Sequence, residues 1–453
     1  MPAAEEHGVQ PIPAEERTGT WLDLSALLVA FLLNPLMYVL GALAVTAGGL
    51  PLWWAVAALT LGQAFAYPLM AIIGRLGVDY GLQGQIGMRA FLGHWGARIL
   101  SSGYRTIVAT YWSAAQAIAA AFGVQALLAG IADVHVRLVP TAVVLAAVQV
   151  ALAILGFDVV RWVTKVVLPL GAVFVVIILT LYFSSDDPRF AVDRAFRSPE
   201  QEFNWVGFAT FFTLIVGSTF TFVTNVADFT CHTRSRRDAW IGLMVPSVLT
   251  TALTTFIGGY AAVATGDGNP FIAAPELTGS TALLVVLLVA ILVQSTGVNV
   301  LNTYTVGLSL LNTAPRLGRF VATAIGGAAA IGLSALPELV TEAQTWIGHV
   351  SNLAFPLTGI ILAELLGRMG GTVDVDALYR PEGRYRYTAG VSVAALISIG
   401  LGVAAYYAVP DEWVKAFWGV GIAAIVQLAL GPVQQRLLGS DRPTARARTA
   451  ETS

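Results

Sequence analysis

The chain has 453 residues, of which 11% are charged and 56% are apolar, and its formal net charge is −2. Soluble domains usually contain about 25% charged residues, so this chain lacks the charges that a soluble globular surface needs. Its apolar content also excludes an intrinsically disordered chain, and the near-neutral charge gives no indication of nucleic-acid binding. The composition therefore predicts an all-α polytopic membrane protein.

A polar segment precedes the first apolar run. Residues 1–20 contain five charged side chains, and they lack the basic start and the short apolar core of a signal peptide. We expect this segment to be a disordered cytoplasmic tail. The one cysteine of the chain, Cys231, excludes an intramolecular disulfide and a cysteine-based metal cluster.

Twelve apolar runs of near-bilayer length follow this tail, and we expect each to form a transmembrane helix. We number them as spans 1 to 12. They cover residues 22–47, 52–74, 106–130, 138–157, 163–184, 205–227, 239–263, 281–303, 319–336, 345–367, 388–409 and 413–435.

The distribution of Lys and Arg between the spans predicts the orientation. If the N-terminus lies inside, 20 of the 25 cations fall on the inner side and 5 on the outer side. Cytoplasmic loops are enriched in Lys and Arg, and a missed or extra helix would blur this bias. We therefore expect a multi-pass protein of the plasma (inner) membrane with both termini in the cytoplasm.

Polar and small residues interrupt spans 1 and 6, which are five helices apart. Span 1 contains Asn34 and Pro35, and span 6 contains Gly217, Ser218 and Thr219. Many transporters consist of two inverted repeats in which discontinuous helices bind the substrate. The alternative is a proline kink and a small-residue packing face, which are common in membrane helices. The matched positions favour a substrate site at two broken helices.

Span 3 carries an aromatic ring and an amide on one face. Trp112 and Gln116 are four residues apart, which places them on the same side of a helix. An indole ring can stack on a flat heterocycle while the amide bonds its edge. The alternative is an interfacial Trp and a Gln that packs between helices.

Span 8 is unusually polar, with Gln294, Ser295, Thr296, Asn299 and Asn302 in a short stretch. No spacing of His, Asp or Glu suggests a metal site, no Gly-rich loop suggests phosphate binding, and no nucleophile has a base nearby. We therefore expect no cofactor and no enzymatic activity.

Three stretches resemble the nucleobase:cation symporter-1 family, which contains purine/cytosine permeases and hydantoin and allantoin transporters. Residues 81–99 resemble the family's loop between spans 2 and 3. Residues 225–239 are similar to its Asn-x-x-Asp-Phe-Thr-Arg pattern after span 6, and residues 296–310 to its span 8 pattern. The resemblance covers residues 20–435.

This resemblance implies a LeuT-like fold of 12 transmembrane helices, in which a 5+5 inverted repeat is followed by two C-terminal helices. The transporter domain would be residues 21–435, with repeats at 22–184 and 205–367 and accessory helices at 388–435. Residues 436–453 would form a second cytoplasmic tail.

The resemblance also implies roles for individual residues. Trp112 would stack on the substrate ring, and Gln116, Asn299 and Asn302 would bond its edge. Many relatives have a span 6 aromatic at the position of Thr219, so we expect either that Phe220 turns into the site or that the pocket is open there. After Asp228-Phe229-Thr230, Cys231 stands where the family usually has Arg.

The coupling cation is less defined than the substrate site. Sodium-coupled relatives place hydroxyl side chains directly before the first span 8 Asn, where this chain has Gly297 and Val298. Ser295 and Thr296 lie just before these positions and form a candidate sodium site in a shifted register. Protons and a degraded ion site are the alternatives.

The predicted function is the import of a planar, nucleobase-like N-heterocycle by cation symport. The class would be that of cytosine, purines, allantoin or hydantoin, and the site would contain Trp112, Gln116, Asn34, Asn299, Asn302 and the stretch Gly217, Ser218, Thr219 and Phe220. A carrier of the same fold for an amino acid, amine or vitamin is one alternative. A sensor that binds such a solute without transporting it is another.

Overall fold

The computed structural model describes residues 10–155, 157–196, 202–380 and 382–438. In this part of the chain the regular elements are helices, and two isolated bridges, Gly19 with Thr233 and Thr388 with Val391, are the β contacts. Each of the twelve predicted spans coincides with one helix or one broken helix pair. The prediction of an all-helical protein is therefore confirmed for the described residues.

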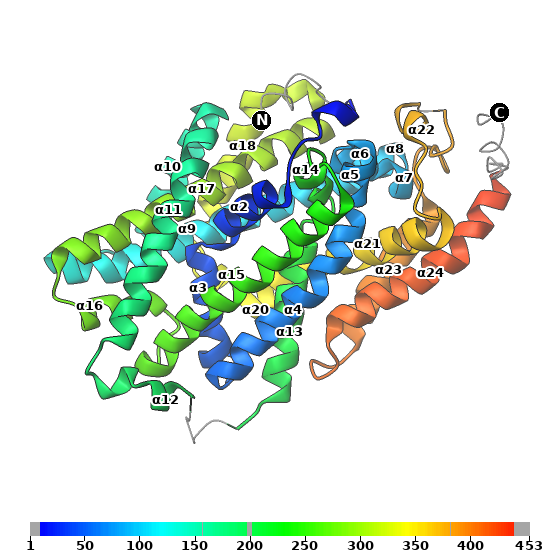
Figure 1. The fold of residues 1–453 in the computed structure, drawn as a ribbon. Helices are drawn as coiled ribbons and strands as arrows, with labels where there is room; N and C mark the ends of the chain where they lie inside the picture. The colour runs from blue at the N-terminus through cyan, green and yellow to red at the C-terminus, as the bar shows by residue number, and fades with distance from the viewer. Residues whose placement is uncertain (1–9, 156, 197–201, 381, 439–453) are drawn as a thin grey trace.

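A first helix group contains the two broken spans and their neighbours. In it, α15 packs on α2, α3 and α4, and α13 packs on α4 (Figure 1). Its members are α2 (Trp21–Leu32), α3 (Pro35–Thr46), α4 (Leu52–Ile73), α13 (Trp205–Phe220) and α15 (Arg236–Thr265).

Glycine allows close contact within this first helix group. A Cβ atom added to Gly258 of α15 would lie 1.8 Å from the carbonyl oxygen of Tyr38, and one on Gly41 of α3 would lie 2.7 Å from Thr255 Cα. Small residues let membrane helices approach until their backbones touch, which favours van der Waals packing where no hydrophobic effect drives association. The α3–α15 contact is of this kind.

A second helix group is centred on the contact between α9 and α17. Here α10 packs on both of these helices, and α18 packs on α17. Its members are α9 (Ser102–Ala132), α10 (Leu138–Leu155), α17 (Thr281–Thr313) and α18 (Gly318–Leu333). The two groups meet where α3 contacts α9 and where α2 contacts α17.

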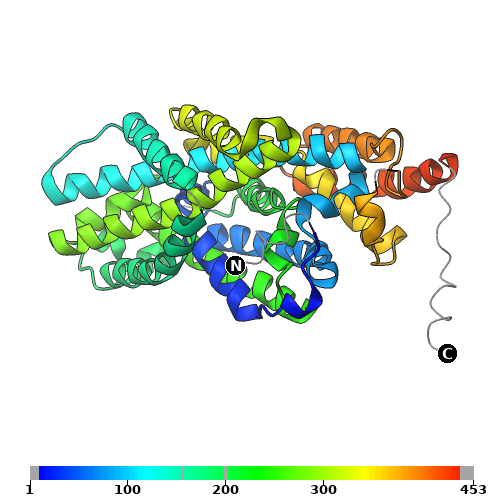
Figure 2. The same cartoon turned by 90° about the horizontal axis from the view of Figure 1, so that it is seen from above.

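The remaining long helices lie around these two groups. α11 packs on α17 and α2, while α23 and α24 pack on each other and on α21 at one edge of the molecule (Figure 2). Their bounds are Phe157–Phe183 for α11, Ala343–Ser351 for α20, Ala354–Leu362 for α21, Val393–Ala408 for α23 and Lys415–Leu437 for α24.

Short helices join the long ones at both ends of the spans. The connections are η1 (Ala14–Glu16), α5 (Arg75–Tyr80), α6 (Gly84–Gly87), α7 (Arg89–Leu92), α8 (His94–Gly96), η2 (Ala97–Ser101), η3 (Pro188–Phe190), α12 (Val192–Phe196), α14 (Val226–Thr230), η4 (Pro270–Ile272), α16 (Ala273–Leu277), η5 (Pro315–Leu317), α19 (Glu338–Thr341), η6 (Ala363–Arg368) and α22 (Val375–Tyr379).

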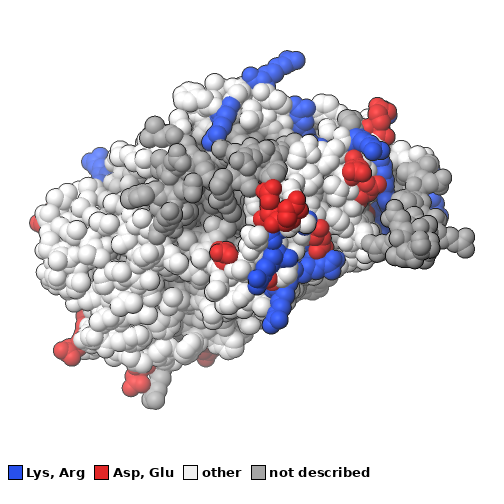
Figure 3. Space-filling view, turned by 45° about the horizontal axis from the view of Figure 1, so that its top comes forward, with Lys and Arg blue, Asp and Glu red and all other residues white. Residues whose placement is uncertain are grey.

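Helix length and surface composition fit a membrane environment. Six of the described helices are long and apolar enough to cross a bilayer, or up to eight if each of two bent pairs counts as one span. Large apolar side chains such as Ile107, Leu249 and Phe320 are exposed, and Figure 3 shows a broad uncharged area on the face it presents. Exposed apolar surface of this extent is stable in lipid rather than in water.

Residues 10–20 differ from the expected disordered tail. Ile12 is buried, and its backbone N–H donates to the carbonyl of Gly81, while Gly19 pairs with the backbone at His232 and Arg234. Buried apolar area and paired backbone groups compensate the entropy of ordering this segment. Residues 1–9 and 439–453 of the two expected tails lie outside the described residues.

Two of the three stretches that carry the family resemblance pack on each other. The N–H of Gly84 donates to the Asp228 carboxylate at 2.7 Å, and Arg105 Nη1 lies 2.9 Å from the same carboxylate. A Cβ atom on Gly84 would lie 2.3 Å from the Thr224 carbonyl oxygen. Asp228 thus joins the segment after span 6 to the loop between spans 2 and 3.

Candidate substrate site

Span 1 is broken at Asn34. α2 ends at Leu32, α3 begins at Pro35, and the two helices are bent by 61°. Asn34 Oδ1 accepts from the N–H of Met37 at 3.2 Å, and Asn34 Nδ2 donates to the carbonyl of Phe31 at 2.8 Å. Asn is a preferred N-cap, and Pro fits the first helical position because no partner is needed there for an N–H. The sequence therefore dictates a new helix start in the middle of the span.

Span 6 is broken one turn later than the sequence suggests. Gly217, Ser218, Thr219 and Phe220 are still helical, and a non-helical turn covers residues 221–225 before α14 begins. A Cβ atom on Gly217 would lie 2.6 Å from Ser351 Oγ and 2.9 Å from Phe355. Gly217 is therefore small because α20 and α21 pack against it, and it does not mark the unwound backbone.

Three of these four residues face away from span 3. Gly217 faces α20 and α21, and the Phe220 ring is fully buried against Phe355 with ring centres 6.1 Å apart. The Thr219 hydroxyl donates to Gln63 Oε1 at 2.5 Å, and Gln63 Nε2 donates to Thr251 Oγ1 at 3.3 Å. The bonds of Thr219 and Gln63 tie α13 to α4 and α15 within the first helix group.

Trp112 reaches the span 6 break from α9. Its indole N–H donates to Thr221 Oγ1 at 3.1 Å, and the Thr221 hydroxyl donates to the carbonyl of Ser218 at 2.6 Å. Ser218 therefore participates through its backbone. Trp112 is 7% exposed, and this bond across the two helix groups fixes the orientation of its indole ring.

Gln116 reaches the span 1 break from the same face of α9. Its Nε2 donates to Asn34 Oδ1 at 3.0 Å, and its Oε1 is buried without a hydrogen-bond partner among the described residues. The structure thus brings Trp112, Gln116 and Asn34 together where the first helix group meets the second.

The span 8 asparagines are bonded within the second helix group. Asn299 Nδ2 donates to the carbonyl of Ser113 at 2.8 Å and to Gln149 Oε1 at 2.6 Å. Asn302 Nδ2 lies 3.5 Å from Asn299 Oδ1. Both asparagines are buried. Ser113 lies about one helical turn before Gln116 on α9, so its bond to Asn299 places Asn299 near Gln116.

Ser295 belongs to the same network. Its hydroxyl accepts from Gln149 Nε2 at 2.9 Å and donates to the carbonyl of Gln116 at 3.3 Å. Ser295 therefore joins α17 to α9 and α10, whereas Thr296 is half-buried. The described residues contain no group of three or more His, Cys, Asp or Glu side chains that could hold a metal ion.

Sequence reasoning missed Gln63 and Gln149. Each is an amide in an otherwise apolar span, 1% and 2% exposed respectively; Gln63 bonds α13 and α15, and Gln149 bonds two residues of α17. An isolated amide at bilayer depth is costly unless it is paired. This rule could have identified both residues from the sequence alone.

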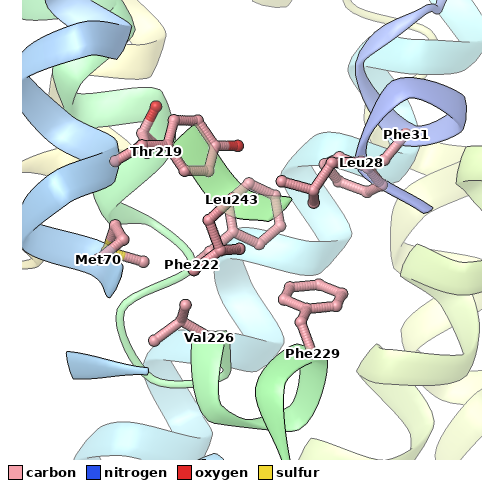
Figure 4. A pocket seen from close by; sticks show the side chains of 9 residues that line it. Leu28, Phe31, Met70, Thr219, Phe222, Val226, Phe229 and Leu243 are labelled. Atoms are coloured by element: carbon pink, nitrogen blue, oxygen red, sulfur yellow. The ribbon is translucent and has the colours of Figure 1, made fainter. Parts of the chain in front are cut away.

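An apolar pocket lies beside the two breaks (Figure 4). The rings of Phe31, Phe222 and Phe229 line it, with Phe31 and Phe222 in edge contact at 5.2 Å between ring centres. Leu28, Tyr67, Met70, Thr219, Val226 and Leu243 complete the lining. The aromatic ring within the span 6 break is therefore Phe222, whereas Phe220 packs on Phe355.

Broken helices that meet at buried amides and an indole, in a protein with several apolar spans, define a membrane transporter. The family model described as "Permease for cytosine/purines, uracil, thiamine, allantoin" matches residues 11–429. The chain belongs to this family, which is the nucleobase:cation symporter-1 family that the motifs indicate, and it is a permease rather than an enzyme.

Solved structures of transporters have the same fold. A structure described as the inward-facing conformation of Mhp1 matches with a TM-score of 0.82 and 18% identity, covering 95% of this chain and 93% of that one. A closed conformation of Mhp1 with bromovinylhydantoin bound matches with a TM-score of 0.77 and 18% identity, over 94% and 95%.

A more distant match is a substrate-bound, outward-open Na⁺-coupled sialic acid symporter, with a TM-score of 0.61 and 12% identity, over 92% of this chain and 90% of that one. A comparison with curated protein sequences finds no match. At these identities the structures establish the fold alone.

Proposed function

We propose that this permease imports a planar N-heterocycle of the nucleobase, hydantoin or allantoin class by cation symport. The observation that carries the proposal is the arrangement of Trp112 and Gln116 on one face of α9, each bonded to one of the two helix breaks. An aromatic platform next to amides suits an uncharged ring with polar edges. The family description and the hydantoin bound in the Mhp1 structure support this class.

Each site residue has a proposed role. Trp112 stacks on the ring, Gln116 bonds its edge, and Asn299 and Asn302 supply further amide groups from α17. The backbone at Asn34 and at residues 221–225 completes the pocket, since unwound backbone exposes groups that lipid would not tolerate. Access alternates as the first helix group rocks against the second.

The fold supports the proposed inverted repeat. Helices five spans apart lie in the same group: α4 and α15 in the first, α9 and α17 in the second, together with α10 and α18. A pseudo-two-fold relation between two five-span repeats produces this pairing. On this reading the chain has twelve spans, with repeats at residues 22–184 and 205–367, and α23 and α24 are accessory helices.

The positive-inside bias supports an orientation in the plasma membrane with both termini in the cytoplasm. The coupling cation is sodium or a proton. For sodium, the candidate hydroxyl ligands are Ser295 and Thr296, but Ser295 already bonds α9 and α10. The Ser295 oxygen accepts one of these bonds and donates in the other, so one lone pair remains to coordinate sodium.

Uptake into proteoliposomes tests the function. We expect accumulation of at least one labelled compound among cytosine, uracil, hypoxanthine, allantoin and hydantoin when an inward sodium or proton gradient is imposed. Separate gradients identify the cation, and empty liposomes provide the background. If none of the five compounds is transported or competes, the proposed substrate class is wrong.

A further inference from the structure

Each amide side chain of the site can direct either its oxygen or its nitrogen toward a ligand, and we call this choice the polarity of the site. The oxygen of an amide accepts hydrogen bonds and its nitrogen donates them, although the two ends have nearly the same shape. Which end faces a ligand is decided only where a chain of hydrogen bonds begins at a backbone group, because a backbone N–H always donates and a carbonyl always accepts. Two such chains meet at this site.

The first chain begins at the span 1 break. The carbonyl of Phe31 requires a donor, and Asn34 Nδ2 supplies it at 2.8 Å; this places Asn34 Oδ1 3.2 Å from the N–H of Met37, which also donates to the backbone carbonyl of Asn34. The orientation of Asn34 is therefore fixed, and its Oδ1 faces Gln116 at 3.0 Å. Gln116 must direct its Nε2 to Asn34, which leaves its buried Oε1 without a partner among the described residues.

The second chain begins at backbone carbonyls of α9. Ser295 Oγ donates to the carbonyl of Gln116, so it accepts from Gln149 Nε2 at 2.9 Å. Gln149 must then direct its Oε1 to Asn299, whose Nδ2 also donates to the carbonyl of Ser113. Both hydrogens of the Asn299 amide are thereby used within the helix packing, and its Oδ1 accepts from Asn302 Nδ2 at 3.5 Å.

We infer that Asn34 and Gln149 are positioning residues that set the polarity of the site, so that the Gln116 oxygen accepts a hydrogen bond from an N–H group of the ligand, while the Asn299 amide has no hydrogen left to donate. This inference rests on the proposed function and narrows its substrate class. The site selects heterocycles with N–H groups on the edge that faces α9, such as cyclic imides and ureides. A ring oxygen or an N-methyl group at that edge leaves a buried acceptor without a donor.

Hydantoin analogues that lack one or both N–H groups test this inference on the native protein. Hydantoin, its two mono-N-methyl derivatives, its dimethyl derivative and oxazolidinedione, in which a ring oxygen replaces one N–H, are compared by thermal shift and by competition for uptake. An unpaired buried acceptor weakens binding by about tenfold or more. We expect hydantoin to bind best, the dimethyl derivative to bind worst, and at least one single replacement to cost about tenfold.

A capping variant tests the role of Asn34. Asn34→Ser keeps a hydroxyl that can cap α3 but removes the Nδ2 contact with Phe31, so Gln116 is no longer held in one orientation. The preference for hydantoin over oxazolidinedione should then shrink. Asn204→Ser is the matched control, because Asn204 caps α13 through Gly207 and donates to the carbonyl of Gly48 in the same way at a distant helix start.

The outcomes separate the two proposals. If heterocycles bind but N-methylated and oxygen-substituted analogues bind equally well, the polarity inference is overturned and the proposed function stands. An unchanged ligand preference in folded Asn34→Ser overturns the role of Asn34. If none of the compounds binds, the proposed function fails and the inference fails with it.

Discussion

At the scale of single residues, the site is organised by hydrogen bonds between uncharged groups. Trp112, Gln116 and Asn299 each bond a group in another span. Charged side chains are costly at bilayer depth, whereas paired amides and hydroxyls are tolerated. A pocket built this way recognises a neutral, planar solute by stacking and by the pattern of its polar edge.

Replacing the stacking platform should weaken binding. Trp112→Ala removes the ring and is expected to cost about 1–3 kcal/mol of binding free energy, by analogy with stacking of bases on aromatic side chains. Trp112→Phe loses the bond to Thr221. Because it keeps an aromatic ring for stacking, it should retain most of the affinity. Ligand titration of the purified protein measures both. Trp240→Ala is the control because Trp240 is exposed, and equal affinities of Trp112→Ala and wild type would contradict the prediction.

The hydroxyl of Thr219 should affect stability more than substrate preference. Thr219→Val leaves Gln63 Oε1 without its donor at a buried position, which is expected to cost about 1–3 kcal/mol of stability. The temperature of unfolding in detergent should fall, while the order of preference among ligands stays the same. A changed ligand preference at unaltered stability would show that the hydroxyl faces the substrate instead.

The sequence identifies the residues of the site better than their partners. Asn34 and Pro35 carry their own local signal, because an N-cap and a Pro at the first helical position specify a helix start. Gly217 carries the same signal for unwinding as for close packing, and only the position of Phe355 distinguishes the two. The pairing of Asn299 with Gln149 joins residues 150 apart in the chain, so no local pattern could reveal it.

At the scale of elements, an N-terminal strap, which we define as residues 12–19, holds the segment after span 6. Gly19 N–H donates to the carbonyl of His232 at 2.8 Å, Arg234 N–H donates to Gly19, and Arg17 Nη1 donates to the carbonyl of Val78 at 2.7 Å. The strap thereby joins α5 to the loop after α14. This contact explains why residues 10–20 are ordered although their sequence is polar.

Cys231 provides a probe of the strap. Burial raises the pKa of the Cys231 thiol to about 12, with a further contribution from the Asp228 carboxylate. Because the thiolate is the reactive form, labelling by maleimide should be slow at neutral pH. The labelling rate should keep rising with pH well above the ordinary cysteine pKa of about 8.5. A rate that levels off near that ordinary value would contradict the buried environment.

Displacing the strap should expose this thiol. A Cβ atom on Gly19 would lie 2.9 Å from the His232 carbonyl oxygen, so Gly19→Val should push the two backbones apart and increase the labelling rate severalfold. Gly279→Val is the control, because a Cβ atom on Gly279 meets no described atom within 4 Å. If Gly19→Val leaves the rate unchanged, the strap does not limit access to Cys231.

At the scale of the whole molecule, two helices pack outside the two groups that form the site. α23 and α24 join η6, which continues α21, through buried polar contacts: Gln427 Nε2 donates to Glu364 Oε1 at 2.6 Å, and Ser398 Oγ donates to Gln427 Oε1 at 3.1 Å. Glu364 also pairs with Arg368, and their side chains are 1% and 8% exposed. The sequence predicts these helices from their apolar runs, but the pairing of Glu364 with Gln427 depends on how they fold back.

The buried Glu364–Arg368 pair should anchor these helices without acting in transport. Glu364→Gln keeps the shape of the side chain but leaves the Arg368 charge without its partner, and breaking a buried pair in this way costs on the order of 3 kcal/mol. The unfolding temperature in detergent should fall, and Glu364→Gln combined with Arg368→Met should recover much of the loss because no buried charge then remains. Since the pair lies on the α21–α24 side of the molecule, the ligand preference of the surviving folded protein should match that of wild type. Equal stability of the single and the double variant would show that charge pairing does not hold α24 in place.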